Sequence, residues 1–360
     1  MWGAIYQFFK RIKNLLILGI YLCFVLSMLA QIVSPSLSVF FAPFGLLFLP
    51  LFLLTLTIGV IYFRRNKWIA ISAIILVAFS FKFLGNSIAL NFNQEKKGLK
   101  VMSWNVKNFD LYNWTKNQET RQKMLTLIDS QDADVLCFQE FYNNPNSYNN
   151  IDALKKLGYQ YISFFPTFSQ KDGDQWGLAI LSKYQLSNSK AITLSKKSSS
   201  LNHCVRADLT FENKKYTIFN AHMQSIHLDY TDLNYIEDVK KEISLIDKIK
   251  SWHILRKILG AYTHRQEQVG ILAEELKASE NVILCCDLND IPASYAYQQL
   301  SKECNDAFKE KGFGLSHTIS IGLPLYRIDY IFISPSIITN SYQRIETELS
   351  DHHMVISYLQ

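Results

Sequence analysis

Cysteine is scarce in this 360-residue chain, which has six cysteines and no CxxC pair. A small disulfide scaffold is therefore excluded, and a zinc site has no support in the sequence. Internal repeats and low-complexity tracts are also absent. Apolar residues make up 49% of the chain, so intrinsic disorder is excluded as a description of the whole.

Acidic residues are nearly absent from the first hundred positions, where Glu95 is the only one. Ten Lys and Arg residues there give a net charge of +9, whereas residues 101–360 have a net charge of −3. The basic surplus therefore belongs to the N-terminal part. Because the remainder is mildly acidic, bulk charge weakens an argument for nucleic-acid binding.

Three long runs in the N-terminal part contain almost no charged residues. They cover residues 15–33, 39–63 and 68–90, and Lys82 alone interrupts the third. A helix needs about 20 apolar residues to cross a bilayer, so we predict three transmembrane helices. A cleaved signal peptide is the alternative for the first run, but it does not explain the two runs that follow. Residues 1–97 are therefore predicted to be a membrane anchor.

The charges of the short loops predict an orientation in the membrane. Basic residues gather at 10–13 and at 64–67, whereas the loop at 34–38 has no charge. The positive-inside rule then places the N-terminus in the cytoplasm and the C-terminal domain outside it, as an integral protein of an inner or plasma membrane. The lysines at 96–100 favour the opposite orientation.

Short apolar segments alternate with amphipathic ones after residue 98. This alternation predicts an α/β layered domain over residues 98–360. Helices are predicted at 119–130 and 265–278, and strands at 100–105, 134–140, 176–182, 206–211, 215–220, 281–287, 326–334 and 354–358.

Several predicted strands end in carboxylate, amide or imidazole side chains. Taken singly, such residues mostly begin turns or cap helices. Taken together, they have the composition of a metal-assisted hydrolytic site for a phosphoester. The residues are Asn105, Glu140, His222, Asp287, Asn289, Asp329, Asp351 and His352.

Three of these residues are candidates for the metal. The carboxylates of Glu140 and Asp351 are hard oxygen donors suited to Mg²⁺, with Mn²⁺ as the alternative. Asn105 adds an amide without adding negative charge, and we expect it at the metal and at a substrate phosphate oxygen. The sequence therefore predicts a divalent-metal cofactor.

The remaining five residues are candidates for catalysis and substrate binding. Asp287 is expected to orient and deprotonate a water molecule. His222 and Asn289 are expected to hold phosphate oxygens, and both His222 and His352 can donate to the oxyanion of the transition state. Asp329 is expected to fix the tautomer of a histidine, as in other Asp–His pairs.

Seven motifs stand in order along the chain, at residues 102–105, 134–140, 177–183, 220–222, 286–290, 327–331 and 350–352. This order resembles the endonuclease/exonuclease/phosphatase superfamily, which includes nucleases, sphingomyelinases and inositol polyphosphate phosphatases. The resemblance runs from about Leu99 to the C-terminus. It implies a four-layer α/β sandwich, in which two packed sheets are flanked by helices, and phosphoester hydrolysis by in-line attack of water with a divalent metal.

A helical insertion is predicted at about 226–262, where the family needs only a short connection. Gly260 is predicted to cap its helix. We expect the helix to pack on its own domain, and the alternative is a basic amphipathic helix that lies on the bilayer next to the active site. Its apolar face consists of Leu245, Ile249, Trp252, Leu255 and Leu259.

The leading functional hypothesis is a membrane-anchored, Mg²⁺-dependent phosphodiesterase that acts on nucleic acid. The first alternative is a phosphodiesterase of phospholipid or sphingolipid headgroups, which the membrane anchor favours. The second is a non-catalytic membrane-binding module, which predicts the loss of at least one site residue, whereas every matched position is present. The expected partners are thus a phosphoester substrate and the bilayer.

Overall fold

The computed structural model describes residues 2–195, 202–226, 230–242, 246–320 and 326–360, and the chain divides into two compact units. The helical unit consists of Met1–Ser87, Ile226–Gln266 and Pro292–Gln298. The sandwich unit consists of Ile88–Ser225, Glu267–Ile291 and Gln299–Gln360. The helical unit therefore combines the N-terminal apolar runs with the predicted insertion.

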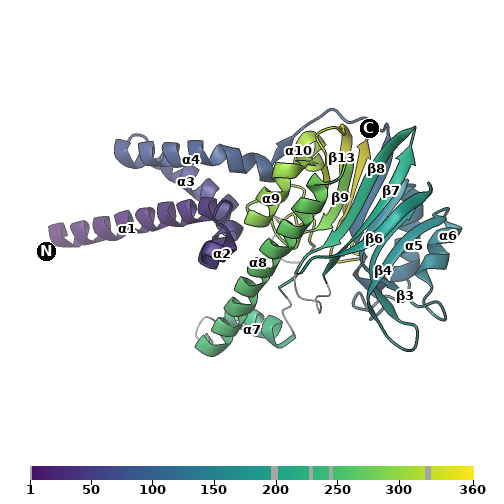
Figure 1. Cartoon of the computed structure of the whole chain (residues 1–360). Coiled ribbons are helices and arrows are strands. Elements are labelled where there is room, and N and C mark those ends of the chain that lie inside the picture. Colours follow the sequence, from purple (N-terminus) through teal and green to yellow (C-terminus); the bar gives the residue numbers. More distant parts are fainter. Residues whose placement is uncertain (1, 196–201, 227–229, 243–245, 321–325) are drawn as a thin grey trace. The chain divides into compact units, whose positions relative to one another are not determined.

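The helical unit confirms three segments that are long and apolar enough to cross a membrane, namely Ala4–Leu29, Pro35–Tyr62 and Lys67–Ser87. The first lies in α1 (Trp2–Leu29), and the third is α4 (Lys67–Ser87) (Figure 1).

The second segment is not one regular helix. It consists of α2 (Pro35–Ser38), the 3-10 helix η1 (Val39–Leu47) and α3 (Phe48–Tyr62). Pro43 lies inside η1. Proline has no N–H to donate and its ring clashes with the preceding turn, so it disfavours a continuous α-helix at this position.

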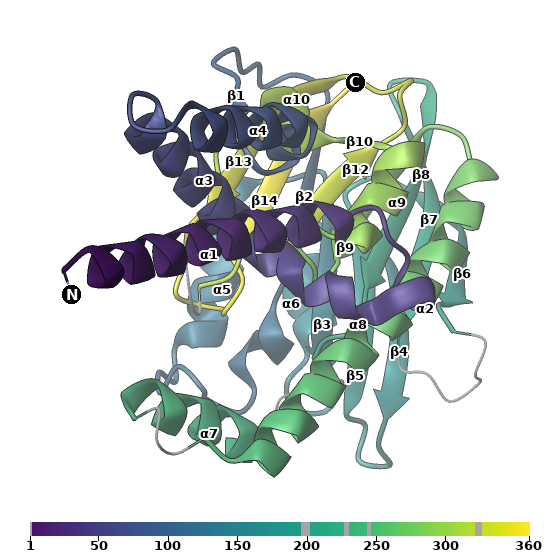
Figure 2. The same ribbon diagram turned by 90° about the vertical axis from the view of Figure 1, so that its left-hand side faces the viewer.

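The predicted insertion contains α7 (Tyr230–Lys241) and the first part of α8 (Lys248–Lys277), both drawn in green in Figure 2. The residues of α8 after Gln266 belong to the sandwich unit. Gln266 Nε2 donates to Ser36 Oγ at 3.2 Å. This hydrogen bond joins α8 to the short helix α2 that follows the first apolar run.

Helix α8 differs from the prediction in two respects. It continues through Gly260 instead of ending there, although an interior glycine costs about 1 kcal/mol, and the two residues that follow, Ala261 and Tyr262, are buried. At the start of the predicted apolar face, Ile249 is 82% exposed and Trp252 is 53% exposed, so these two side chains do not pack on the described residues as expected. Leu245 lies outside the described residues.

Two six-stranded mixed sheets and their helices form the sandwich unit, so the predicted α/β sandwich is confirmed. The first sheet has the order β10-β12-β9-β8-β7-β6, and the second has the order β13-β14-β2-β3-β5-β4. The pairs β8–β9 and β2–β3 are parallel, and the other neighbours within these two sheets are antiparallel.

The strands of the first sheet are β6 (Leu186–Thr193), β7 (His203–Phe211), β8 (Lys214–His222), β9 (Val282–Asp287), β10 (Asn305–Asp306) and β12 (Asp329–Ile333). Those of the second are β2 (Leu99–Asn105), β3 (Val135–Asn143), β4 (Tyr161–Ser169), β5 (Gln175–Ser182), β13 (Thr339–Ile345) and β14 (Met354–Leu359). A separate pair joins β1 (Ala89–Leu90) to β11 (Phe313–Gly314). The remaining helices are η2 (Lys107–Asp110), α5 (Thr120–Gln131), α6 (Asn150–Lys156), α9 (Tyr295–Glu303) and α10 (Ala307–Lys311).

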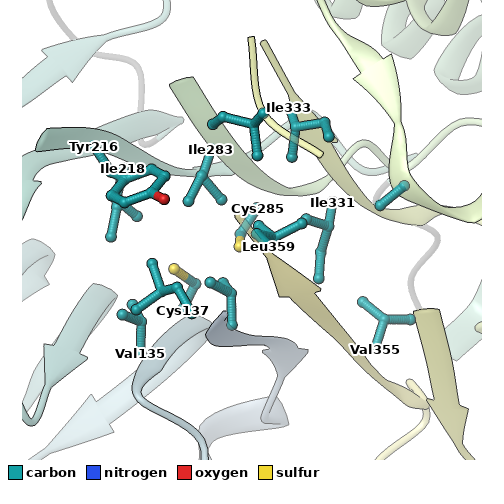
Figure 3. Close-up of a cluster of buried hydrophobic side chains, with 14 of the residues drawn as sticks. Val135, Cys137, Tyr216, Ile218, Ile283, Cys285, Ile331, Ile333, Val355 and Leu359 are labelled. Atoms are coloured by element: carbon teal, nitrogen blue, oxygen red, sulfur yellow. The ribbon is translucent and has the colours of Figure 1, made fainter. Parts of the chain in front are cut away.

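The main core of the unit lies between the two sheets. Val135 and Cys137 of β3 pack there with Ile218 of β8 and Ile283 of β9 (Figure 3). Side chains alternate across a strand, so the intervening residues of the second sheet point the other way. Trp104 of β2 accordingly packs in a second core with residues of α5 and α6. These packed layers hold the strand ends rigidly in place.

Candidate active site

Neighbouring strands of the first sheet end side by side and bring polar residues together at their ends. The parallel strands β8 and β9 end together, so His222 lies in register with Asp287. The antiparallel strand β12 begins at Asp329, which lies opposite Asp287. Asn105 ends β2 of the second sheet, and its Nδ2 donates to Asp287 Oδ2 at 2.9 Å, so the two sheets contribute to one site.

Glu140 belongs to a distorted part of β3. Its φ is +48°, and the register between β3 and β5 shifts at this position. Such a bulge re-aims a side chain, and here Glu140 Oε1 accepts from Asn105 Nδ2 at 3.0 Å. His222 Nε2 lies 3.5 Å from Asp287 Oδ2 and 3.9 Å from Glu140 Oε1. The bulge therefore places the Glu140 side chain beside the polar residues at the strand ends.

Asp329 and His352 form a buried pair. The carboxylate oxygens lie 3.0 and 3.2 Å from His352 Nδ1, while the backbone N–H of Asp329 donates to Thr318 Oγ1 at 3.0 Å. His352 Nε2 lies 3.9 Å from Asp287 Oδ2. An ionised Asp329 therefore holds the proton on Nδ1 and leaves Nε2 directed at the rest of the site.

The charge of this pair follows from its surroundings. Burial lowers the pKa of His352, but the carboxylates of Asp329 and Asp287 outweigh it and raise that pKa to about 10. Burial also raises the pKa of Asp329. Because an imidazolium between two carboxylates is favoured, we assign the proton to His352. The ring is then a donor at both nitrogens.

The loop before β14 is fastened to β2. Ser350 Oγ donates to the carbonyl of Asn105 at 2.8 Å, and Trp104 Nε1 donates to the carbonyl of His352 at 2.9 Å. Between these anchors, Asp351 Oδ2 pairs with Lys107 Nζ at 2.8 Å. Lys107 is not among the residues predicted from the sequence. The one feature of the sequence that could have indicated it is its position two residues after Asn105.

Asn289 follows β9 in the left-handed conformation, with a φ of +52°. Its backbone N–H donates to Asp287 Oδ1 at 3.0 Å, and its Nδ2 donates to the carbonyl of Met223 at 3.0 Å. The turn thus fixes the Asp287 carboxylate from one side while Asn105 fixes it from the other. All eight residues selected from the sequence lie around these strand ends.

A model of the endonuclease/exonuclease/phosphatase family matches residues 102–352. The chain belongs to this family. No curated protein sequence matches the chain significantly. The family consists of phosphoester hydrolases, so the sandwich unit has the fold of a phosphoesterase.

Solved structures of the same fold share little sequence with the chain. The human nocturnin catalytic domain with bound sulfate is 19% identical, with a TM-score of 0.55 over 75% of this chain and 95% of that one. A family protein from Bacteroides vulgatus is 16% identical, with a TM-score of 0.54 over 74% and 99%. A mannosyl-6-phosphatase from Bacteroides thetaiotaomicron is 17% identical, with a TM-score of 0.50 over 73% and 100%.

The site contains carboxylate oxygens of the kind that hard divalent cations take as ligands. Glu140 and Asp351 offer carboxylate oxygens, and their side chains are 36% and 25% exposed, so an ion can reach them. The Lys107 ammonium, 2.8 Å from Asp351 Oδ2, already balances the negative charge of that carboxylate. Asn105 is oriented differently from expectation, because its Nδ2 faces the carboxylates while its Oδ1 accepts from the N–H of Lys107 at 3.0 Å.

A second carboxylate-rich group is less suited to an ion. Asp287, Asp329 and His352 offer ligand atoms within 4.8 Å of one another. However, His352 Nδ1 and the Asp329 carboxylate are already paired with each other. We therefore interpret Asp329 and His352 as an acid–base pair. The carboxylates of Glu140 and Asp351 are also paired, with Asn105 and Lys107, but they are the more exposed oxygen donors of the site.

Proposed function

We propose that the chain is a membrane-anchored, divalent-metal-dependent phosphodiesterase that acts on nucleic acid. The observation that carries this proposal is the convergence of the Asp329–His352 pair, Asp287, Asn105 and Glu140 at the ends of strands from both sheets. Such a set contains a base, a cationic donor and metal-binding oxygens within one site. The family supports phosphoester hydrolysis.

Asp287 is proposed to orient and activate the attacking water. Asn105 and the backbone N–H of Asn289 hold its two oxygens in fixed directions. His352, charged and oriented by Asp329, donates from Nε2 to a phosphate oxygen as negative charge develops there. His222 lies on the other side of Asp287 and supplies a second contact to the phosphate. The chain thus positions both the nucleophile and the oxyanion.

Glu140 and Asp351 are proposed to hold Mg²⁺ through their carboxylate oxygens. The ion supplies Lewis-acid stabilisation of the phosphoryl oxygens when it is bound. Asn105 then acts as an anchor for the carboxylates in the orientation described above.

The three apolar segments are proposed to anchor the enzyme, with the sandwich unit outside the cytoplasm. The basic residues at 10–13 and 64–67 support this orientation. A reporter phosphatase that is active only outside the cytoplasm, fused after Gln360, should be active. A silent but fully expressed fusion would reverse the orientation.

An activity panel tests the substrate. Full-length protein in detergent is assayed with Mg²⁺ and with EDTA on DNA, RNA and sphingomyelin, and Asp287→Asn is the control for contaminating enzymes. We expect Mg²⁺-dependent cleavage of a nucleic acid that the variant lacks. Cleavage of sphingomyelin alone would support the lipid-headgroup alternative, and EDTA-resistant activity would refute the metal assignment.

A further inference from the structure

The segment that follows β2 has an unusual backbone. Lys107, Asn108, Phe109 and Asp110 have φ values of 42°, 56°, 52° and 58°, and Asn113 has a φ of 53°. L-residues other than glycine rarely adopt this left-handed region, and a run of four costs free energy. Strained backbone of this kind persists where the surrounding structure fixes it, and it clusters at functional sites.

Internal contacts hold this segment in place. Phe109 is fully buried and lies edge-on to Phe138 and Phe141, with ring centroids 5.9 and 5.6 Å apart. Tyr148 Oη donates to the carbonyl of Phe109 at 2.8 Å. Asp110, also buried, accepts from the backbone N–H of Thr115 at 3.3 Å. The segment is therefore a built loop with its direction fixed by the core.

This fixed loop holds two large aromatic side chains in solvent. Tyr112 is 56% exposed and Trp114 is 46% exposed. Their ring centroids lie 5.0 Å apart at an interplanar angle of 54°. Packing alone does not account for exposed rings on a strained loop, because their apolar surface remains in water.

Lys107 connects this aromatic pair to the active site. Its Nζ lies 5.0 Å from the centroid of the Trp114 ring and 2.8 Å from Asp351 Oδ2. Its backbone N–H also donates to the side chain of Asn105 at 3.0 Å. The rings therefore lie within one lysine side chain of a carboxylate assigned to the reaction.

We propose that Tyr112 and Trp114 form a stacking platform for a nucleobase of the substrate, beside the phosphoester that is cleaved. This inference rests on the proposed function and specifies its substrate as one with an accessible base. Single-stranded nucleic acids are bound by aromatic faces together with basic side chains that follow the phosphates. The loop has this composition, since Lys107 and Lys116 accompany the rings and its only acid from 107 to 117, Asp110, is buried.

The test uses full-length enzyme in detergent and two single-stranded oligonucleotides of equal length. One has normal bases, and the other has a base-free sugar at the nucleotide next to the cleaved bond. Loss of one base–aromatic stack typically costs about 5- to 150-fold in affinity. We expect Trp114→Ala to raise KM by such a factor on the normal oligonucleotide with little change in kcat, and to leave KM on the base-free one unchanged.

Two further variants separate stacking from a structural role. Trp114→Phe retains an aromatic face and should restore most of the affinity. Phe313→Ala is the matched control, because Phe313 is 59% exposed and pairs with Phe92 at 5.1 Å and 54°, nearly the geometry of the Tyr112–Trp114 pair. It should leave both KM values unchanged.

The outcomes distinguish the two proposals. If the wild type cleaves both oligonucleotides but Trp114→Ala leaves KM unchanged, or impairs both substrates equally, the platform is refuted and the nuclease function stands. If the wild type cleaves neither, the nuclease function itself is refuted and the platform with it. If Trp114→Ala weakens binding to phosphatidylcholine vesicles but leaves the oligonucleotide kinetics unchanged, the two rings contact the bilayer and not a nucleobase. This result would overturn the platform.

Discussion

The two units differ in how exposed their large apolar side chains are. In the sandwich unit, Trp104 and Phe138 are fully buried. In the helical unit, Leu37, Val60 and Phe79 are between 70% and 83% exposed. Exposure to water costs about 25 cal/mol per Å² of apolar surface, so the outer surface of the helical unit is suited to hydrocarbon. The same residue types therefore predict burial in one unit and contact with lipid in the other.

Buried polar side chains show the complementary difference. Ser27 and Ser80 of the helical unit each donate to a carbonyl three residues earlier, at 2.7 Å, and so are satisfied within one helix. In the sandwich unit, Asp287 and Asp329 bond to residues from distant strands and loops. Such long-range polar contacts are costly to bury, and we expect each to support either catalysis or a specific strand arrangement.

The largest expected effect is on catalysis through the Asp329–His352 pair. His352→Ala should lower kcat by about 10²- to 10⁴-fold, because it removes the donor to the phosphate oxyanion. Asp329→Ala should have a somewhat smaller effect, since it removes the group that orients that donor. The losses of kcat are not additive for residues that act as a unit, so the double variant should be little worse than His352→Ala alone.

Steady-state kinetics and melting temperature of the four proteins in this cycle provide the measurement. If the kinetic losses multiply, or if Asp329→Ala lowers only the melting temperature, then Asp329 has a structural role alone. The Asp329–His352 pair would then stabilise the sandwich unit without contributing to catalysis.

A second buried pair is expected to affect stability rather than catalysis. Arg327 Nη2 lies 2.7 Å from Asp306 Oδ2, and both side chains are 1% exposed. Asp306→Asn leaves a buried charge without its counter-ion, which typically costs about 3–5 kcal/mol. Urea unfolding of the sandwich unit in detergent measures this loss.

The matched control for Asp306→Asn is Glu119→Gln, whose partner Lys123 is on the surface. A surface pair contributes at most about 1 kcal/mol, so this variant should unfold nearly like the wild type. Equal stability of both variants would show that burial does not distinguish these two ion pairs.

A smaller effect is expected at Glu140, which is partly exposed. Glu140→Gln keeps the shape of the side chain but removes the charge proposed to bind Mg²⁺. Even residues around metal ligands change affinity about 10- to 100-fold, so the Mg²⁺ concentration for half-maximal activity should rise at least about tenfold. Glu274→Gln, exposed on α8, is the control. Unchanged activity at limiting Mg²⁺ would remove Glu140 from the metal site.

The central strands of the sandwich unit could be predicted from sequence, and the edge strands could not. The strands β2, β3, β8 and β9 lie inside their sheets, are buried over most of their length and contain short apolar runs. By contrast, β4, β6 and β13 were not predicted, and each of them is at the edge of its sheet. An edge strand has one unpaired side and is often exposed, as most of β6 is, so its side chains give a weak pattern.

Most site residues were accessible from sequence for a related reason. Asn105, His222 and Asp287 each end a predictable strand, so an uncommon polar residue stands out against the apolar run. Lys107 and Trp114 lie in a left-handed loop without any periodicity. Their relation to Asp351 depends on contacts between residues far apart in the chain, which the sequence pattern does not contain.

The smallest predicted effect lies in the helical unit and tests a helix boundary that sequence placed wrongly. As the end of a helix, Gly260 would favour a left-handed conformation, in which alanine destabilises the helix. In the interior of α8, a Cβ at Gly260 meets no atom within 4 Å, and Gly260→Ala should stabilise the helix by about 0.5–1 kcal/mol. Hydrogen exchange of α8 amides should then slow by about 2- to 5-fold, and catalysis should not change.

A glycine of the sandwich unit gives the opposite expectation. Gly98 has a φ of +96°, and a Cβ there would lie 2.2 Å from the carbonyl oxygen of Leu359. Gly98→Ala should therefore speed exchange in the neighbouring strands β2 and β14, because the backbone must shift to admit the methyl group. If Gly260→Ala also speeds exchange, α8 is interrupted at this residue and consists of two helices instead of one.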